Sequence, residues 1–232
     1  MSCTAILLCA GRGERLGADV PKAQVMLAGR PLFTWSLAAL ERAASIDAIV
    51  VVGAVRTLQP LLAASGLAAG KIVAWTGGGR ERQDSVARGL HLVPETADLV
   101  AVHDAARALV SPEVIDRVVG DALAHGAAIA AVPLEDTLKR TTLQTIDATV
   151  PRASLWRAQT PQVFRRTWLA EAHAGAAARA TDDAALVEAL GHAVRVTPGD
   201  PLNMKITTAA DLALAEAWLE RRTAAADVRE RR

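Results

Sequence analysis

The sequence predicts an α/β fold, a three-layer sandwich built on a mostly parallel sheet. Short, continuous apolar runs alternate with segments of helical periodicity, which is the pattern of right-handed βαβ units. Such apolar runs are typical of parallel strands that helices cover on both faces. Between Pro133 and Phe164 the alternation breaks, and short β-prone pieces predict a β-hairpin arm inserted into the sandwich.

The apolar runs are the predicted strands. They span residues 4–9, 48–52, 72–74, 99–103, 127–132 and 193–197. Three glycines at 77–79 end the third of these strands. The helical segments between the strands place these runs side by side in one parallel sheet.

The predicted helices have apolar residues at a period near 3.6. They span residues 32–44, 58–67, 84–92, 112–125, 166–176 and 183–190, and a last helix begins near residue 208. Pro31 suits the first turn of the first helix, and Ser111 followed by Pro112 is an N-cap followed by a first helical residue. Thr208 and Asp211 form the pattern of a capping box.

We expect one domain over residues 1–222 with an arm at about 134–155, followed by a charged, alanine-rich tail at 223–232 that frays. The arm consists of two β-prone pieces, at 137–140 and 149–152, around a polar turn. Isolated hairpins are marginally stable, and this one carries little apolar surface. It therefore requires a partner surface to pack on.

Composition excludes several classes of protein. In 232 residues, a hydrophobic fraction of 51% is ample for a core, and a net charge of +1 gives no reason to expect nucleic acid as a partner. No apolar run approaches the ~20 residues of a membrane span, and no signal peptide is evident. Cys3 and Cys9 do not suggest a disulfide framework, so a reducing compartment fits and we expect a cytoplasmic protein.

The stretch from Leu7 to Gln24 carries the strongest functional signal. Gly11 and Gly13 follow the first strand and allow the backbone to turn sharply close to a ligand. Arg15 and Lys22 add two cations to the same loop. Backbone N–H groups and cations at the carboxyl end of a strand are suited to a polyphosphate.

This stretch fits one of three known kinds of glycine-rich loop. A dinucleotide fingerprint requires G-x-G-x-x-G, but Gly17 comes one residue too late. A P-loop requires G-K-[ST], which is absent. The remaining pattern, G-x-G-x-R followed by Pro21-Lys22, is that of nucleotidyltransferases that hold a whole triphosphate. The alternative without function is a glycine-rich turn with solvated charges.

Further polar residues follow other strands, and ligands of open α/β sheets bind beyond the carboxyl ends of the strands. Asp104 can bind a ribose hydroxyl or a divalent cation, or it can simply cap its loop. Thr181-Asp182-Asp183 is first of all a helix cap, and Lys205 could be a plain lysine on an edge strand. Zinc spacing and a G-x-S-x-G elbow are both absent, so the chemistry is positional and electrostatic.

Taken in order, these motifs resemble those of the 2-C-methyl-D-erythritol 4-phosphate cytidylyltransferase family over about residues 4–216. The matching motifs are Leu8-Cys9-Ala10-Gly11-x-Gly13-x-Arg15, Pro21-Lys22, Gly78-Gly79-x-x-Arg82-x-x-Ser85-Val86, His103-Asp104-Ala105-Ala106-Arg107, Asp136-Thr137-x-Lys139, Trp156-x-x-Gln159-Thr160-Pro161-Gln162, Thr181-Asp182-Asp183 and Asn203-x-Lys205-Ile206-Thr207. Each motif alone is weak, but the ordered set is highly specific. The resemblance implies a Rossmann-like sheet of the nucleotidyltransferase type.

The resemblance also implies an activity, namely transfer of a cytidylyl group from CTP to 2-C-methyl-D-erythritol 4-phosphate with release of pyrophosphate. Mg²⁺ is the implied cofactor. The implied catalytic residues are Arg15, Lys22, Arg152 and Lys205. The implied CTP-binding residues are Cys9, Ala10, Gly11, Gly13, Gly79, Ser85 and Asp104, of which Asp104 also serves the metal. The implied acceptor-binding residues are Arg107, Thr137, Thr160 and Thr181.

By the same resemblance the protein is a homodimer whose arms interlock, so Thr137 and Arg152 serve the partner's site. Two positions depart from the family pattern: Leu8-Cys9 stands where Pro-Ala or Leu-Ala is common, and Ala108 stands where a proline usually follows. Two alternatives stay open. One is a cytidylyltransferase that acts on ribitol 5-phosphate, and the other is a non-catalytic nucleotide-binding module of the same fold.

Overall fold

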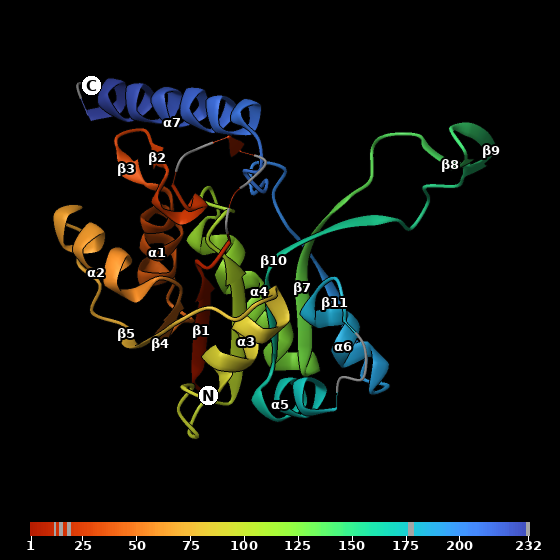
Figure 1. Ribbon diagram of the computed structural model, residues 1–232, viewed down its shortest axis with the longest axis horizontal. Coiled ribbons are helices and arrows are strands. Elements are labelled where there is room, and N and C mark those ends of the chain that lie inside the picture. The colour runs from red at the N-terminus through yellow and green to blue at the C-terminus, as the bar shows by residue number, and fades with distance from the viewer. Residues whose placement is uncertain (12, 14–15, 18–19, 176–178, 231–232) are drawn as a thin grey trace.

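The computed structural model describes residues 1–232 except 12, 14–15, 18–19, 176–178 and 231–232, and of residues 222–230 it describes the backbone. A seven-stranded sheet in the order β11-β7-β10-β6-β1-β4-β5 forms the centre of the molecule (Figure 1). Its strands are β1 (Cys3–Leu8), β4 (Ala48–Val52), β5 (Ile72–Thr76), β6 (Leu99–Asp104), β7 (Ala127–Pro133), β10 (Trp156–Arg165) and β11 (Arg195–Pro198).

The sheet is mostly parallel, as the sequence predicts. Strand β1 pairs in parallel with β4 and β6, β4 with β5, and β7 with β11. The exception is β10, which is antiparallel to both of its neighbours, β6 and β7. The sequence did not reveal β10, because Thr160-Pro161-Gln162 has the composition of a polar bend; the strand accommodates it as an irregularity between Ala158 and Gln162.

The helices confirm the predicted alternation, with ends that differ by a few residues. They are α1 (Leu32–Arg42), α2 (Val55–Ala64), α3 (Arg82–Leu90), α4 (Pro112–His125), α5 (Arg166–Ala174), α6 (Asp183–Ala189) and α7 (Ala209–Glu230). The Ser111 hydroxyl accepts a hydrogen bond from the Val114 amide, so the predicted N-cap is confirmed. Helix α7 runs to Glu230 and so includes most of the predicted tail at 223–232, because its alanine-rich sequence favours helix.

The layers follow from the alternation of side chains along β1. Ala5 and Leu7 face one core, where Phe33 of α1 and Ile115 of α4 pack. Ile6 and Leu8 face the opposite core, which contains residues of α3, α5 and α6. Because successive side chains of a strand point to opposite faces, one apolar strand supplies both cores.

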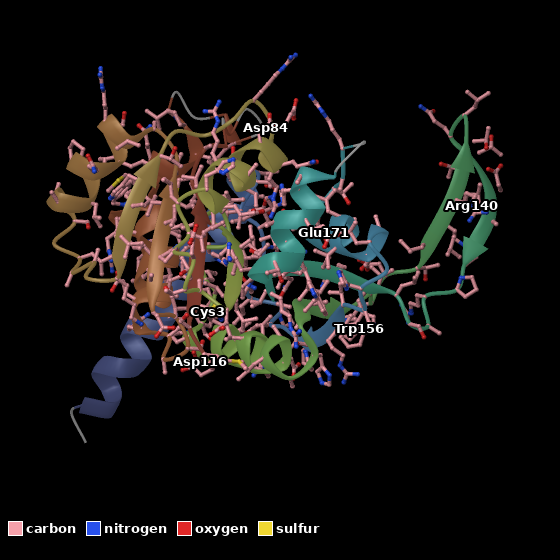
Figure 2. All side chains as sticks on the ribbon, turned by 90° about the horizontal axis from the view of Figure 1, so that it is seen from below. Cys3, Asp84, Asp116, Arg140, Trp156 and Glu171 are labelled. Carbon is pink, nitrogen blue, oxygen red and sulfur yellow. The ribbon has the colours of Figure 1, made fainter. Side chains whose placement is uncertain are left out.

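Two features lie outside this sandwich. The short strands β2 (Met26–Leu27) and β3 (Arg30–Pro31) form a small hairpin, which lies below α7 in Figure 1. The predicted arm is confirmed as a hairpin of β8 (Leu138–Thr142) and β9 (Thr145–Val150), which extends far from the sandwich. Figure 2 shows Arg140 in this arm, well away from the sheet. Within the described residues, no helix is long and apolar enough to cross a membrane.

Candidate active site

A cavity of about 550 Å³ opens beyond the carboxyl ends of β1 and β6, between the glycine-rich loop and the start of α3. This is the edge of the sheet at which the sequence predicts a ligand. Nine of the predicted site residues line it, namely Cys9, Ala10, Gly11, Gly13, Lys22, Gly79, Ser85, Asp104 and Lys205. Arg15 lies outside the described residues.

The glycines allow the two loops to approach each other closely. A Cβ on Gly78 would lie 2.2 Å from the Cβ of Ala10, so the loop after β5 packs directly on the loop after β1. Gly13 has a φ of +75°, and a Cβ there would lie 2.8 Å from the Cβ of Lys22. These contacts leave a cavity wall of backbone and small side chains.

Ser85 shapes the wall from beneath. Its hydroxyl is buried, accepts a hydrogen bond from the Gly79 amide at 2.9 Å and donates to the Glu81 carbonyl at 3.1 Å. The turn at Gly79 is therefore fixed to the first turn of α3. Cys9 is also buried, and burial raises the pKa of its thiol well above the ordinary value. The thiol is thus a neutral, apolar part of the wall.

A chain of charged side chains forms the floor of the cavity. The Asp104 carboxylate accepts hydrogen bonds from Arg82 Nε at 3.1 Å and from Lys205 Nζ at 2.7 Å. The same guanidinium donates through Nη1 to Asp183 at 2.7 Å. His173 contacts the other oxygen of Asp183 at 3.0 Å. Arg82 thus joins two carboxylates that come from different strands and helices.

The electrostatics of this chain favour the ionised forms. Burial alone would raise the pKa of Asp104, but the charges of Arg82 and Lys205 outweigh it and hold this pKa well below the ordinary range. Burial lowers the pKa of Arg82, and the nearby charges of Asp183 and Asp104 more than reverse that effect. At neutral pH Asp104 and Arg82 therefore form an ionised pair in the floor.

Thr160 and Arg107 lie behind this floor rather than in the lining. The Thr160 hydroxyl is buried, where it accepts a hydrogen bond from the Asp104 amide at 3.1 Å and contacts His103 Nδ1 at 3.0 Å. Burial lowers the pKa of His103 to about 4, so its ring is neutral at pH 7. Since an N–H already donates to the hydroxyl oxygen, the hydroxyl proton is available to His103.

The guanidinium of Arg107 donates to two main-chain carbonyls, those of Asn203 at 2.7 Å and Ala158 at 3.1 Å. It thereby connects the end of β6 to β10 and to the segment that carries Lys205. Burial lowers the pKa of Arg107. In this structure the side chain holds the backbone together around the site.

The other three predicted residues do not meet at the cavity. Thr137 and Arg152 lie in or beside the arm, and Thr181 precedes α6; all three are exposed. Within this chain, the structure does not bring the arm residues to Lys22 or Lys205.

The most important residues absent from the predicted site are Arg82 and Asp183. Arg82 appears in the motif after the triple glycine, but nothing local marks it as the centre of an ion-pair chain. Asp183 is 1% exposed, although its sequence context is that of a helix cap. The helix is capped instead by its neighbour Asp182, whose side chain accepts from the Ala185 amide. In the sequence, the only indication that Asp183 has another role is that a second aspartate, Asp182, stands beside it and can supply the cap.

The donor set suits a hard cation that the substrate itself helps to bind. Among the described residues, no three His, Cys, Asp or Glu side chains are grouped as a metal cage. Asp104 is the carboxylate in the floor, and each of its oxygens accepts one hydrogen bond there. A carboxylate offers about four acceptor positions, and Mg²⁺ often uses one or two carboxylates plus phosphate oxygens. The residues present therefore fit this ion.

Comparison with known proteins agrees with this geometry. The family model "IspD: 2-C-methyl-D-erythritol 4-phosphate cytidylyltransferase" matches residues 3–221. A protein of that name from Synechococcus sp. (strain WH7803) is 45% identical over 94% of this chain and 99% of its own length. One from Gloeobacter violaceus is 44% identical over 93% of this chain and 95% of its own length.

Among solved structures, the Thermus thermophilus enzyme of the same name has a TM-score of 0.75 at 36% identity, covering 93% of this chain and 98% of that chain. The family match spans the loop of Lys22, the floor of Asp104 and the segment of Lys205, so it covers the whole cavity. The chain belongs to the 2-C-methyl-D-erythritol 4-phosphate cytidylyltransferase family.

Proposed function

We propose that this protein is a nucleotidyltransferase that transfers CMP from CTP to 2-C-methyl-D-erythritol 4-phosphate. The products are 4-diphosphocytidyl-2-C-methyl-D-erythritol, an intermediate of the non-mevalonate route to isoprenoid precursors, and pyrophosphate. The observation that carries the proposal is one cavity that contains the glycine-rich loop, Lys22, Asp104 and Lys205. A triphosphate and an anionic acceptor both require cations at fixed positions, and these residues supply them.

The chemistry requires no protein base. The attacking group is a phosphate oxygen of the acceptor, which is largely ionised near pH 7 because the second pKa of a phosphate ester is ~6. The difficulty is that two anions must meet. At ~4 Å and an effective dielectric of ~20, two unit charges repel by ~4 kcal/mol. Lys22 and Arg15 offset this repulsion on the triphosphate, and Lys205 offsets it on the acceptor.

Asp104 and Arg82 position these charges. Lys205 is half-exposed and rests on the Asp104 carboxylate, so it is oriented into the cavity before the acceptor arrives. Because the site holds the two reacting groups in line, a bimolecular reaction becomes effectively unimolecular, and its barrier falls. Asp104 and the triphosphate oxygens would hold Mg²⁺, which when bound neutralises part of the charge on the triphosphate.

The cavity wall favours a pyrimidine. Cys9, Ala10 and Gly79 line the cavity with backbone and small side chains, a surface that we propose suits the flat ring of a pyrimidine. We therefore expect CTP to be used well ahead of ATP and GTP. Equal use of purine triphosphates in a competition assay would contradict this assignment of the wall.

We further propose a homodimer in which the arm of one chain reaches the site of the other. Thr137 and Arg152 are exposed, and the arm also exposes Leu143 and Ile146. A hairpin with so little buried surface requires a second surface, and a two-fold partner is the commonest one. We also place the protein in the cytoplasm, where its two free, buried cysteines would stay reduced.

The experiment is pyrophosphate release from CTP and Mg²⁺ with 2-C-methyl-D-erythritol 4-phosphate or ribitol 5-phosphate as acceptor, each compared with a reaction that lacks acceptor. We expect release with the first acceptor and little with the second. Preference for ribitol 5-phosphate would assign the alternative cytidylyltransferase activity. If the protein binds the nucleotide but releases no pyrophosphate with either acceptor, it is a non-catalytic module.

A further inference from the structure

The glycine-rich loop is attached to the rest of the molecule through Leu16. This side chain is 7% exposed, although it lies between Gly13 and Lys22, which both line the cavity. The Leu16 amide donates to the Gly13 carbonyl at 2.8 Å. Gly13 in turn is packed against Lys22, as its short Cβ distance indicates. The position of Leu16 is thus coupled to that of Lys22 through Gly13.

Leu16 belongs to neither core of the sheet. It is part of a third cluster of buried residues, which we call the α7 cluster and which comprises Leu16, Val25, Leu27, Leu32, Ala108, Leu109, Ile206, Ala215 and Leu219. Ala215 and Leu219 come from α7, whose ribbon lies above the β2–β3 hairpin in Figure 1. The cluster includes residues on both sides of Lys22 in the sequence, Leu16 before it and Val25 after it. Helix α7 therefore shares one buried apolar cluster with residues on both sides of Lys22.

The beginning of α7 is fixed at the same cavity. The Asp211 carboxylate accepts hydrogen bonds from the Thr207 hydroxyl at 2.7 Å and from the Thr208 amide at 2.8 Å. The hydrogen bond from Thr207 lowers the pKa of Asp211 to about 2, so this cap is ionised at pH 7. Thr207 lines the cavity, as does Lys205 two residues earlier. The helix thus begins beside the cavity and shares a buried cluster with Leu16 of the glycine-rich loop.

We propose that α7 positions the triphosphate loop, and that Leu219 is a positioning residue for Lys22. This inference rests on the proposed use of CTP. Leu219 does not line the cavity, so it acts through the α7 cluster and Leu16. Truncating a buried leucine leaves a gap into which its neighbours relax only partly. The loop then loses its fixed position relative to the base-binding wall, while that wall, held by Ser85 and Gly79, keeps its geometry.

The test is Leu219→Ala, with calorimetric affinities for CTP and CMP in Mg²⁺ and with KM and kcat. We expect the affinity for CTP to fall about tenfold. This is a smaller factor than the ~10² by which a 1 Å misplacement can lower a reaction rate. CMP lacks the β- and γ-phosphates, so its affinity should change little. Leu214→Ala, at a position 60% exposed on the same helix, is the matched surface control.

A second control separates positioning from stability. Leu169 of α5 is fully buried in a core of the sheet, away from the α7 cluster. Leu169→Ala should lower the Tm at least as much as Leu219→Ala but leave CTP affinity unchanged. If Leu219→Ala does not fold, Leu219→Val, which removes less of the side chain, is compared with the same controls by the same measurements.

The proposal is overturned if CTP affinity is unchanged in the folded Leu219 variant, if CTP and CMP weaken equally, or if Leu169→Ala weakens CTP as much. Failure of the wild-type protein to bind CTP or release pyrophosphate is a different outcome, because it would refute the proposed function itself.

Discussion

Around the cavity, side chains are held by partners within the same chain. Arg82 donates to Asp104 and Asp183, and Lys205 rests on Asp104. In the arm, side-chain hydrogen bonds join arm residues to one another, such as Lys139 to Thr149 at 2.7 Å, and Leu143 is 95% exposed. The Arg152 carbonyl accepts a hydrogen bond from the Leu155 amide at 3.0 Å, but among the residues that the structure describes, nothing in the sandwich fixes the position of the Arg152 side chain.

This difference indicates two ways of building one site. The cavity is pre-organised, because its charges are paired and oriented before any substrate binds. In the proposed homodimer, the arm presents residues whose geometry the partner's surface completes. Changes in the cavity should therefore impair chemistry or folding of a single chain, whereas changes in the arm should impair what the second chain contributes.

The largest effect is expected at Lys22. Replacing it with alanine should lower kcat by ~10²–10³, the typical loss for one pre-organised donor to developing charge. Arg15→Lys should also lower kcat, since the planar guanidinium, which can donate two parallel hydrogen bonds, is replaced by an ammonium group that acts as a point charge. Turnover is measured at saturating CTP and Mg²⁺. Wild-type rates in the Lys22 variant would remove this residue from the proposed mechanism.

The next effect distinguishes the arm from the cavity directly. Arg152→Ala should raise the acceptor KM and lower kcat while CTP binding stays nearly intact. When Arg152→Ala chains are exchanged with Lys22→Ala chains, each heterodimer should contain one doubly defective site and one intact site. Activity should recover to about half of wild type per heterodimer, by counting sites under two-fold symmetry.

Unmixed variants brought to the same concentration are the control for this exchange. An inactive mixture, with heterodimers demonstrated by differential tagging, would show that both residues act in the same chain. The shared-site arrangement would then be abandoned, although the cavity assignment would stand.

A smaller effect is expected from Asp183→Asn, which keeps the shape of the side chain but removes its charge. Hydrogen bonds to charged groups contribute ~1.5–3 kcal/mol, so we expect the free energy of unfolding to fall by about 2 kcal/mol in urea. Asp182→Asn is the comparison: asparagine is as good an N-cap as aspartate, and this variant loses only the acceptor of one hydrogen bond from a neutral donor, Gln162 Nε2 at 2.8 Å, so we expect a smaller loss of stability. Equal stability of the two variants would mean that the Arg82 ion pair does not hold the cavity floor together.

The smallest effect concerns the tip of the arm. Leu143 and Gln144 have φ values of +47° and +69°, in the region that favours Asn and Gly. Replacing them with Asn-Gly should raise stability by about 1 kcal/mol or less, because left-handed conformations cost side chains ~1–2 kcal/mol. The urea midpoint measures the gain, and Gln144→Ala, which keeps a Cβ, should show none. A lower midpoint for Asn-Gly would mean that Leu143 itself is held by a contact.

Much of this protein was determined by the sequence alone. The strands around Ile6 and Val50, the cap at Ser111 and the glycines that shape the cavity depend on local patterns, because periodicity, capping and backbone freedom are properties of neighbouring residues. The ordered motifs also identified most of the cavity lining, since the carboxyl ends of parallel strands meet at one edge of a sheet.

Only the tertiary structure decided the rest. Arg82 and Asp183 are 101 residues apart, and their ion pair exists because α3 and α6 cover the same face of the sheet. The antiparallel β10 and the joint burial of Leu16 with Leu219 are likewise products of packing between distant segments. Such contacts leave no periodic signal, because each side chain's environment is supplied by residues far away in the chain.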